Sequence, residues 1–164
     1  MLFDMQCTSV LGTITMVGTE TALTGLWMEG QTQAMRDMRG PASRVETPIL
    51  RRTKEWLARY FAGEQPDPRE IPLELRGTAF QIRVWELLRQ IPYGTVTTYG
   101  TLARQLEQAG KRMSARAVGG AVGRNPVSIL IPCHRVIGAD GSLTGYSGGI
   151  DRKQWLLRHE GAVL

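Results

Sequence analysis

Short stretches of interspersed apolar and polar residues fill the first third of the chain. They cover residues 2–9, 12–17 and 23–28, and turns containing Gly and Thr separate them. Such stretches in series, bounded by turn residues, predict strands of a small antiparallel meander. The polar segment 31–44 that follows has neither the period of a strand nor that of a helix, and it is left unassigned.

A helix is predicted next, because the apolar residues change to helical spacing. Thr47 is a good N-cap, Pro48 suits the first helical position, and Gly63 can end the helix. The residues of its apolar stripe are Ile49, Leu50, Trp56, Leu57, Tyr60 and Phe61. Residues 64–77 contain three prolines among charged residues, which predicts a linker that runs over the surface.

The second half of the chain has mostly helical periodicity. Thr78 and Gln81 form a capping box before a helix whose stripe is Phe80, Val84, Leu87, Leu88 and Ile91. A second helix carries Tyr99, Leu102, Ala103 and Leu106, and a third begins at Ser114 and reaches about Val122. A short break around Gly110 separates these two, which makes them a helix-turn-helix candidate. In the last helix, Asp151 is the predicted cap, Trp155, Leu156 and His159 are carried along its length, and Gly161 ends it.

The fold class is therefore α/β (α+β), with an N-terminal domain of residues 1–76 and a C-terminal domain of residues 77–164. The first domain holds nine Lys and Arg against ten Asp and Glu, whereas the second holds eleven against five. This asymmetry suggests that the second domain faces a polyanion, although the charge taken alone favours an ordinary solvated basic surface.

The cysteine and histidine content argues against a metal site or a disulfide framework. Cys7 and Cys133 lie far apart in sequence, and His134 and His159 are the only histidines. No apolar run approaches the roughly 20 residues of a membrane span, and the N-terminus lacks the features of a signal peptide. We expect a cytoplasmic protein without cofactor or metal, in which Cys7 is a small apolar residue of an edge strand.

Residues 132–136, with the sequence Pro-Cys-His-Arg-Val, are the strongest candidate for chemistry. They follow the apolar run 127–131, which predicts a buried strand. A Cys beside a His is a common source of thiolate at neutral pH, since a free thiol has a pKa of roughly 8.5. Adjacent side chains of an extended segment point to opposite faces, so Cys133 and His134 need a bridging water or a sharp turn to communicate.

Four further features each allow two interpretations. The helix 114–122 is almost entirely Ala and Gly around Arg116, which suits either close helix packing or a narrow groove of DNA, where Arg116 fills the gap left by a displaced base. Asn125 is either a loop corner or a tie between that helix and the segment before Cys133. The loop 145–149 is either an ordinary surface loop or the wall of a planar ligand's site. Glu160 is either a surface charge or the group that orients His134.

Taken together, these segments closely resemble the O6-alkylguanine-DNA alkyltransferases, which are methylated-DNA–protein-cysteine methyltransferases. The resemblance covers residues 77–162 in order and rests on the sequences of 115–121, 125–126, 131–136, 145–149 and 159–161. It implies a ribonuclease-H-like N-terminal domain and a winged-helix-like C-terminal domain. Residues 1–76 match this family only in general character.

The resemblance also implies the roles of individual residues. Cys133 accepts the alkyl group, His134 takes its proton through a water, and Glu160 stabilises the imidazolium. Tyr99 donates a hydrogen bond to the departing purine, and Asn125 braces the hinge between recognition helix and acceptor segment. The implied DNA-binding residues are Arg116, Ser114, Ala115, Ala117, Gly119, Gly120 and Arg124, and the implied pocket residues are Tyr146, Ser147, Gly148 and Val136.

The implied function is direct repair of double-stranded DNA that bears O6-alkylguanine or O4-alkylthymine, by base flipping and a single irreversible transfer. The expected protein is a monomer that can cluster on DNA. Two alternatives stay open: a helix-turn-helix transcription factor with a structural Cys133, and a cysteine hydrolase whose base is His159.

Overall fold

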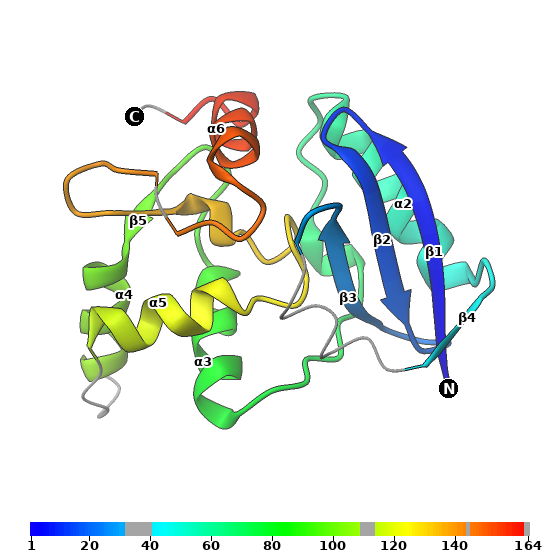
Figure 1. The fold of residues 1–164 in the computed structure, drawn as a ribbon, viewed down its shortest axis with the longest axis horizontal. Coiled ribbons are helices and arrows are strands. Elements are labelled where there is room, and N and C mark those ends of the chain that lie inside the picture. The colour runs from blue at the N-terminus through cyan, green and yellow to red at the C-terminus, as the bar shows by residue number, and fades with distance from the viewer. Residues whose placement is uncertain (32–40, 109–113, 144, 163–164) are drawn as a thin grey trace. The chain divides into compact units, whose positions relative to one another are not determined.

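The computed structural model describes residues 1–31, 41–108, 114–143 and 145–162. The chain divides into two compact units (Figure 1). The sheet unit comprises residues 1–76 and 126–128, and the helical unit comprises residues 77–125 and 129–164. The chain passes from the sheet unit to the helical unit between Arg76 and Gly77, and it returns to the sheet unit for residues 126–128, which was not predicted.

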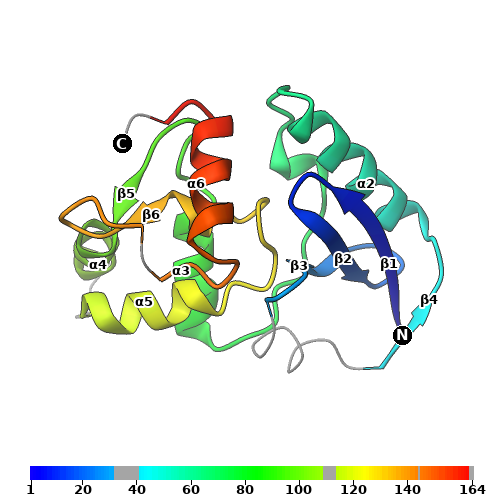
Figure 2. The same cartoon turned by 45° about the horizontal axis from the view of Figure 1, so that its top comes forward.

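The sheet unit contains the predicted antiparallel meander, formed by β1 (Leu2–Ser9), β2 (Gly12–Gly18) and β3 (Leu23–Met28). A fourth strand, β4 (Ala42–Arg44), pairs in parallel with the start of β1, which gives the order β3-β2-β1-β4 (Figure 2). Strand β4 was not predicted, because a strand of only three residues, Ala-Ser-Arg, shows no detectable period. An ion pair of 2.9 Å from Arg44 Nε to the buried Asp4 Oδ1 helps to fix it.

Helix α2 (Pro48–Phe61) packs against β1 and β2 and was correctly predicted. The Thr47 hydroxyl accepts the amide of Leu50 at 3.4 Å, and Gly63 follows the helix with a φ of 93°, a left-handed conformation that favours glycine. The buried residues of α2 are Ile49, Leu50, Thr53, Trp56, Leu57 and Tyr60. They form the core of this unit together with Ile14, Met16, Leu23 and Leu26 from the sheet.

The outer edge of β3 is covered by two separate segments. The amide of Leu23 donates to Pro72 O at 2.8 Å, and the amide of Glu74 donates to Leu23 O at 2.9 Å. Further along β3, Leu26 pairs with Val127. Residues 64–77 are therefore more than the predicted surface linker: they include the short helix η1 (Pro68–Glu70) and the buried Ile71, and they shield an otherwise open strand edge.

The helical unit contains α3 (Ala79–Leu88), α4 (Tyr99–Gln108), α5 (Ala115–Gly123) and α6 (Ile150–His159). Helix α5 packs on both α3 and α4, so the predicted pair of helices forms, although residues 109–113 between them lie outside the described residues. The predicted capping box of Thr78 and Gln81 is present. The predicted stripe of α3 missed Trp85, which is buried and donates its indole N–H to Ala121 O at 2.9 Å.

Two local predictions for this part of the chain were wrong. Residues 127–131 are not a strand: after the isolated bridge at Val127 the backbone turns, and Ile129 has a φ of 72°. Asp151 does not cap α6, because Gly149 occupies the N-cap position and Asp151 lies in the first turn, where its charge favours the helix dipole. Among the described residues, no helix is long and apolar enough to cross a membrane.

Candidate active site

A two-stranded parallel sheet brings Cys133 and Tyr99 to one place. Strand β5 (Thr97–Thr98) pairs with β6 (Val136–Ile137), and Tyr99 directly follows β5. The short helix η2 (Cys133–Arg135) directly precedes β6. The segment around Cys133 is thus a tight turn rather than an extended strand, so the alternation of adjacent side chains does not apply to Cys133 and His134.

Cys133 is buried, and this sets its acidity. Burial raises the pKa of the thiol to about 11, although a hydrogen bond from the Asn125 side chain and the positive charge of Lys153 oppose that rise. The expectation of a thiolate at neutral pH is therefore wrong for this state of the protein. A base must remove the proton when the thiol reacts.

His134 and Glu160 form a buried pair that can supply this base. His134 Nε2 lies 2.8 Å from Glu160 Oε2, and both side chains are fully buried. Burial lowers the pKa of His134 although Glu160 opposes this, so the ring is neutral at pH 7. An ionised carboxylate only accepts hydrogen bonds, so Nε2 carries the ring's single proton. The other ring nitrogen, Nδ1, is buried, and it has no hydrogen-bond partner within the described part of the chain.

Arg135 keeps Glu160 ionised. Its Nε and Nη2 donate to the two oxygens of Glu160 at 2.7 Å and 3.0 Å, and its Nη1 donates to Ile91 O at 2.7 Å. Burial alone would raise the pKa of Glu160, but the hydrogen bonds from His134 and Arg135 bring it well below its usual range. The guanidinium also lies 5.7 Å from the centre of the Tyr93 ring. Arg135 thereby determines which His134 nitrogen remains available as an acceptor.

Lys153 is a second buried cation in this site. Lys153 belongs to α6, its side chain is fully buried, and its ammonium group donates a short hydrogen bond to Val136 O. Burial lowers the pKa of Lys153, and a negative charge on Cys133 acts in the opposite direction. The attraction between the Lys153 ammonium group and the negative charge also stabilises a thiolate at Cys133. Val136 therefore enters the site through its carbonyl, which anchors this ammonium group.

Tyr99 lies against the predicted pocket loop. A Cβ on Gly145, whose φ is 88°, would lie 2.9 Å from the Tyr99 hydroxyl, so only glycine fits there. Within the loop, Tyr146 and Gly148 are buried, whereas Ser147 is exposed. Burial and the nearby Cys133 raise the pKa of Tyr99, which keeps its hydroxyl protonated as a hydrogen-bond donor at neutral pH.

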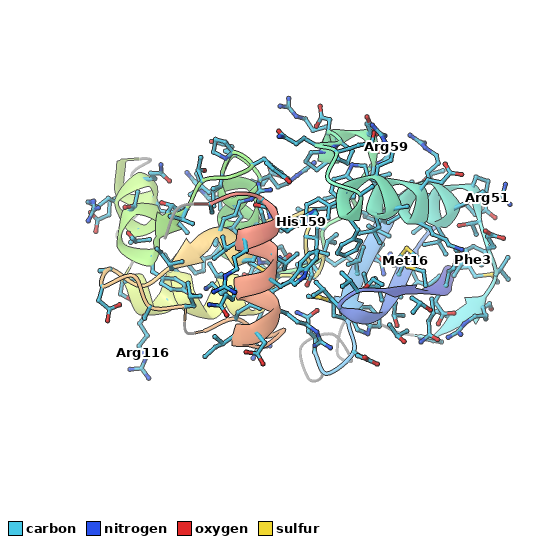
Figure 3. The ribbon with its side chains drawn as sticks, turned by 90° about the horizontal axis from the view of Figure 1, so that it is seen from above. Phe3, Met16, Arg51, Arg59, Arg116 and His159 are labelled. Atoms are coloured by element: carbon cyan, nitrogen blue, oxygen red, sulfur yellow. The ribbon has the colours of Figure 1, made fainter. Side chains whose placement is uncertain are left out.

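The exposed face of α5 is built from small residues. Ala115, Arg116, Ala117, Gly120 and the C-cap Arg124 are exposed, and the Arg116 side chain extends away from the helix (Figure 3). Ser114 is also exposed, but its hydroxyl caps α5 by accepting the amide of Ala117 at 3.1 Å. The two glycines differ, because a Cβ on Gly119 would meet the Tyr99 ring at 3.7 Å, whereas one on Gly120 would meet nothing within 4 Å.

Asn125 connects the end of α5 to the acceptor turn. Its Nδ2 donates to Ile131 O at 2.7 Å, and Asn125 itself is buried. This is the tie that the second interpretation of Asn125 required, except that Ile131 belongs to a turn and not to a strand. Among the described residues, no group of three His, Cys, Asp or Glu side chains is arranged to hold a metal ion.

Comparison with known proteins shows which family the chain belongs to. Residues 79–162 match the model of the 6-O-methylguanine DNA methyltransferase DNA-binding domain, and residues 6–75 match that of the ribonuclease-like domain of the same family. The chain belongs to the 6-O-methylguanine DNA methyltransferase family. The ribonuclease-like domain confirms the fold expected for the N-terminal part.

Several members of the 6-O-methylguanine DNA methyltransferase family resemble the chain over different lengths. A methylated-DNA–protein-cysteine methyltransferase of Shigella flexneri is 55% identical over 108 residues, which are 66% of this chain but only 61% of the Shigella protein. The protein of that name from Mycolicibacterium paratuberculosis is 46% identical over 161 residues, which cover 95% of this chain and 93% of the relative. The crystal structure of Mycobacterium tuberculosis OGT in complex with DNA has a TM-score of 0.85 and 43% identity, and the match covers 97% of this chain and 92% of that one.

Two charged residues of the candidate site, Arg135 and Lys153, were not among the site residues predicted from the sequence. The signal for Lys153 was present, because Lys153, Leu156, Leu157 and Glu160 follow the spacing of one helix face, and the apolar pair marks that face as buried. Arg135 stands inside an apolar motif, and a buried charge requires a partner. Glu160, already a candidate, was the carboxylate that could pair with it.

Proposed function

We propose that the protein repairs alkylated DNA by moving the alkyl group of O6-alkylguanine, and of O4-alkylthymine, to Cys133 in a single irreversible reaction. The observation that carries this proposal is the set of hydrogen-bonded polar side chains beside the thiol. A buried cysteine lies beside a neutral histidine whose Nε2 is bound to an ionised carboxylate, while Nδ1 is left to accept a proton. The names of the relatives and the match to the DNA-binding domain support the same activity.

The proposed reaction starts with removal of the thiol proton. A water molecule bridges Cys133 and His134, takes the proton from Sγ and passes one to Nδ1. The resulting imidazolium is stabilised by Glu160, whose charge is maintained by Arg135. Lys153 stabilises the thiolate while it exists. General bases placed in this way typically contribute about 10²–10⁴-fold to a rate.

The thiolate then displaces guanine from the alkyl carbon. An S–C bond forms, the C–O bond breaks, and the bonding electrons remain on the guanine as a developing anion. The Tyr99 hydroxyl donates a hydrogen bond to that anion, a role that suits its raised pKa. The product at Cys133 is a thioether, which neither water nor reductants cleave, so each protein molecule reacts once.

We further propose that α5 presents its small residues to the minor groove of double-stranded DNA. Exposed Ala and Gly allow close approach but offer no groups that read base edges, which predicts little sequence preference. Arg116 extends from this surface and takes the place of the flipped nucleotide in the base stack (Figure 3). The protein acts as a monomer that can cluster on DNA, and Tyr146, Ser147 and Gly148 line the base pocket.

Turnover separates this function from a cysteine hydrolase. A hydrolase would use His159 as its base, but that ring stacks on Trp155 with centroids 4.7 Å apart, and the next residue, Glu160, already holds His134. With excess O6-methylguanine duplex, we expect demethylated product to reach a plateau equal to the amount of protein. Product that keeps accumulating would contradict the proposal, and strong preference for one unmodified operator sequence would favour a transcription factor.

A further inference from the structure

Three residues of the acceptor region belong to the sheet unit. Between Asn125 and Ile129, which are both in the helical unit, residues 126–128 extend along the edge of β3. The amide of Leu26 donates to Pro126 O at 2.9 Å, and the amide of Ser128 donates to Leu26 O at 3.0 Å. The chain thus leaves the helical unit for only three residues before it returns toward Cys133.

A buried glutamine fixes the end of this excursion. Gln31 Oε1 accepts the backbone amide of Met28 at 2.8 Å and the hydroxyl of Ser128 at 3.1 Å. Ser128 is fully buried and Gln31 nearly so. One amide oxygen therefore satisfies a donor from the end of β3 and a donor from residues 126–128. Its loss would leave two buried polar groups unpaired, which costs more than the bond itself contributes.

The next residue has a strained backbone. Ile129 has a φ of 72°, and no other non-glycine residue of the described ranges has a positive φ. For a β-branched side chain this conformation is unfavourable, and it persists only where the surroundings hold it on both sides. On one side, Ser128 is held by Leu26 and Gln31. On the other side, the bond of 2.7 Å from Asn125 Nδ2 to Ile131 O closes the turn.

We propose that Gln31 is a positioning residue for alkyl transfer: through Ser128 it holds the strained turn at Ile129, and so sets where the Asn125 amide meets Cys133. This inference rests on the function proposed above. It gives the ribonuclease-like domain a part in the reaction, although that domain contains none of the proposed catalytic residues. The chemistry stays in the helical unit, and the sheet unit determines the geometry of its acceptor turn.

The test compares three single variants. Ser128→Ala and Gln31→Leu remove the two ends of the Gln31–Ser128 bond. Thr53→Val is the matched control, because Thr53 is a fully buried residue of the same unit whose hydroxyl donates to Ile49 O at 2.8 Å, away from residues 126–128. For each protein, one measures the melting temperature, the duplex Kd, the transfer rate at saturating O6-methylguanine duplex and with the free base, and the pH dependence of Cys133 alkylation by iodoacetamide.

We expect Ser128→Ala and Gln31→Leu to slow transfer from both substrates on the order of tenfold, because small displacements of reacting groups have large effects on rate. The iodoacetamide profile should shift to higher pH, since Asn125 then stabilises the thiolate less. The duplex Kd should stay unchanged. Thr53→Val, which removes a buried hydroxyl of the same unit, should change neither the rates nor the profile.

The proposal is overturned if Ser128→Ala and Gln31→Leu resemble Thr53→Val in rate and pH profile, or if they weaken duplex binding alone. If Gln31→Leu does not fold, Ser128→Ala decides the outcome, because it removes a single oxygen atom. A wild-type protein that transfers no alkyl group would refute the proposed function. A shifted iodoacetamide profile in the variants would support the positioning role of Gln31 in that case too, and an unshifted one would refute it.

Discussion

The acceptor site and the exposed face of α5 lie in the same unit, yet they are built in opposite ways. Around Cys133, the buried side chains of His134, Arg135 and Glu160 are joined by hydrogen bonds of 3.0 Å or less, and the buried Lys153 donates to Val136 O. On α5, by contrast, the exposed residues are mainly Ala and Gly, and the side chain of Arg116 extends outward. The acceptor site is buried and dense in charge, whereas the face of α5 is exposed and built from small side chains.

This difference follows from what each region is proposed to do. Proton transfer requires groups whose positions and charges are fixed before the substrate arrives, and burial of paired charges provides this. Binding to any DNA sequence requires close approach without specific contacts, and a surface of small side chains provides that. Changes in the acceptor site should therefore affect rate and pH dependence, whereas changes on α5 should affect binding and base extrusion.

The largest effect is expected for Arg135→Leu. Glu160 would lose its bidentate partner, and breaking a buried ion pair typically costs roughly 3–5 kcal/mol of stability. The pKa of His134, lowered chiefly by burial and further by Arg135, would rise. A larger fraction of His134 would then be protonated at neutral pH, and less of it could act as a base. We expect transfer to fall on the order of 10²-fold at pH 7 and to recover partly at higher pH.

Single-turnover rates between pH 6 and 10, measured with free O6-methylguanine, check this prediction. Arg158→Leu is the control, since Arg158 is an exposed arginine of α6. A variant that folds and keeps the wild-type pH profile would show that Arg135 does not control the base.

The pH dependence of stability should reveal the buried thiol. The folded-state pKa of Cys133 is about 11, above the usual value of roughly 8.5 for an unfolded chain. A raised pKa contributes stability that is present below the unfolded value and is lost as pH rises toward the folded value. We expect Cys133→Ala to lack this alkaline loss, a difference of roughly 3 kcal/mol between pH 8 and pH 11.

Urea denaturation of both proteins at several pH values measures this difference. The acid range provides the internal control. The pKa of Glu160 is lowered in the folded state, so its contribution to stability decreases progressively as pH falls below about 4, with or without the thiol. Parallel curves through the alkaline range would mean that the folded protein does not suppress ionisation of Cys133.

For the exposed face of α5, Arg116→Ala should separate the flipping of the nucleotide out of the duplex from the alkyl transfer itself. If Arg116 supports the flipped nucleotide, its loss should slow transfer from duplex DNA by about tenfold, or about 1.4 kcal/mol, and leave the reaction with the free base unchanged. Tyr99→Phe should slow both reactions. Arg124→Ala is the matched control, since this exposed arginine at the end of α5 should contribute to affinity but not to the rate at saturation. Equal rate losses of Arg116→Ala on both substrates would show that Arg116 does not support the flipped nucleotide.

The smallest effect concerns the stability of α5 itself. A Cβ on Gly120 meets nothing within 4 Å, and Ala is favoured over Gly in a helix by up to about 1 kcal/mol. We therefore expect Gly120→Ala to raise the melting temperature and Gly120→Leu to weaken duplex binding without loss of stability. If Gly120→Leu bound the duplex as tightly as the wild-type protein, the DNA would not contact this face of α5. Bulky groups at Gly119 would instead press on the Tyr99 ring.

The sequence predicted most elements because local signals and tertiary structure agree there. The caps at Thr47, Thr78 and Ser114 and the apolar spacing of their helices are examples. The apolar run 127–131 was mistaken for a strand, because buried turns and buried strands have the same composition. Nothing local indicates that Val127 pairs with β3 while Ile129 adopts a positive φ, since both result from contacts far away in sequence.

For the candidate site, the sequence indicated several of the residues but not their protonation states. Its uncharged and acidic members could be chosen by residue type and motif, but burial decides how they behave. The thiol pKa of about 11 and the neutral state of His134 depend on an enclosure that no local pattern describes. Arg135 and Lys153 were overlooked because charged residues are usually assigned to the surface, a rule that fails where their charges are paired inside.

The central claim is that Cys133 is the acceptor and reacts once. Intact-mass measurement and peptide mapping after incubation with excess O6-methylguanine duplex test it most directly. We expect one added methyl group per molecule, located on the peptide that contains Cys133, with no modification of Cys133→Ala even though that variant still binds the duplex. Unmodified protein after many turnovers, or a methyl group on Cys7, would contradict it.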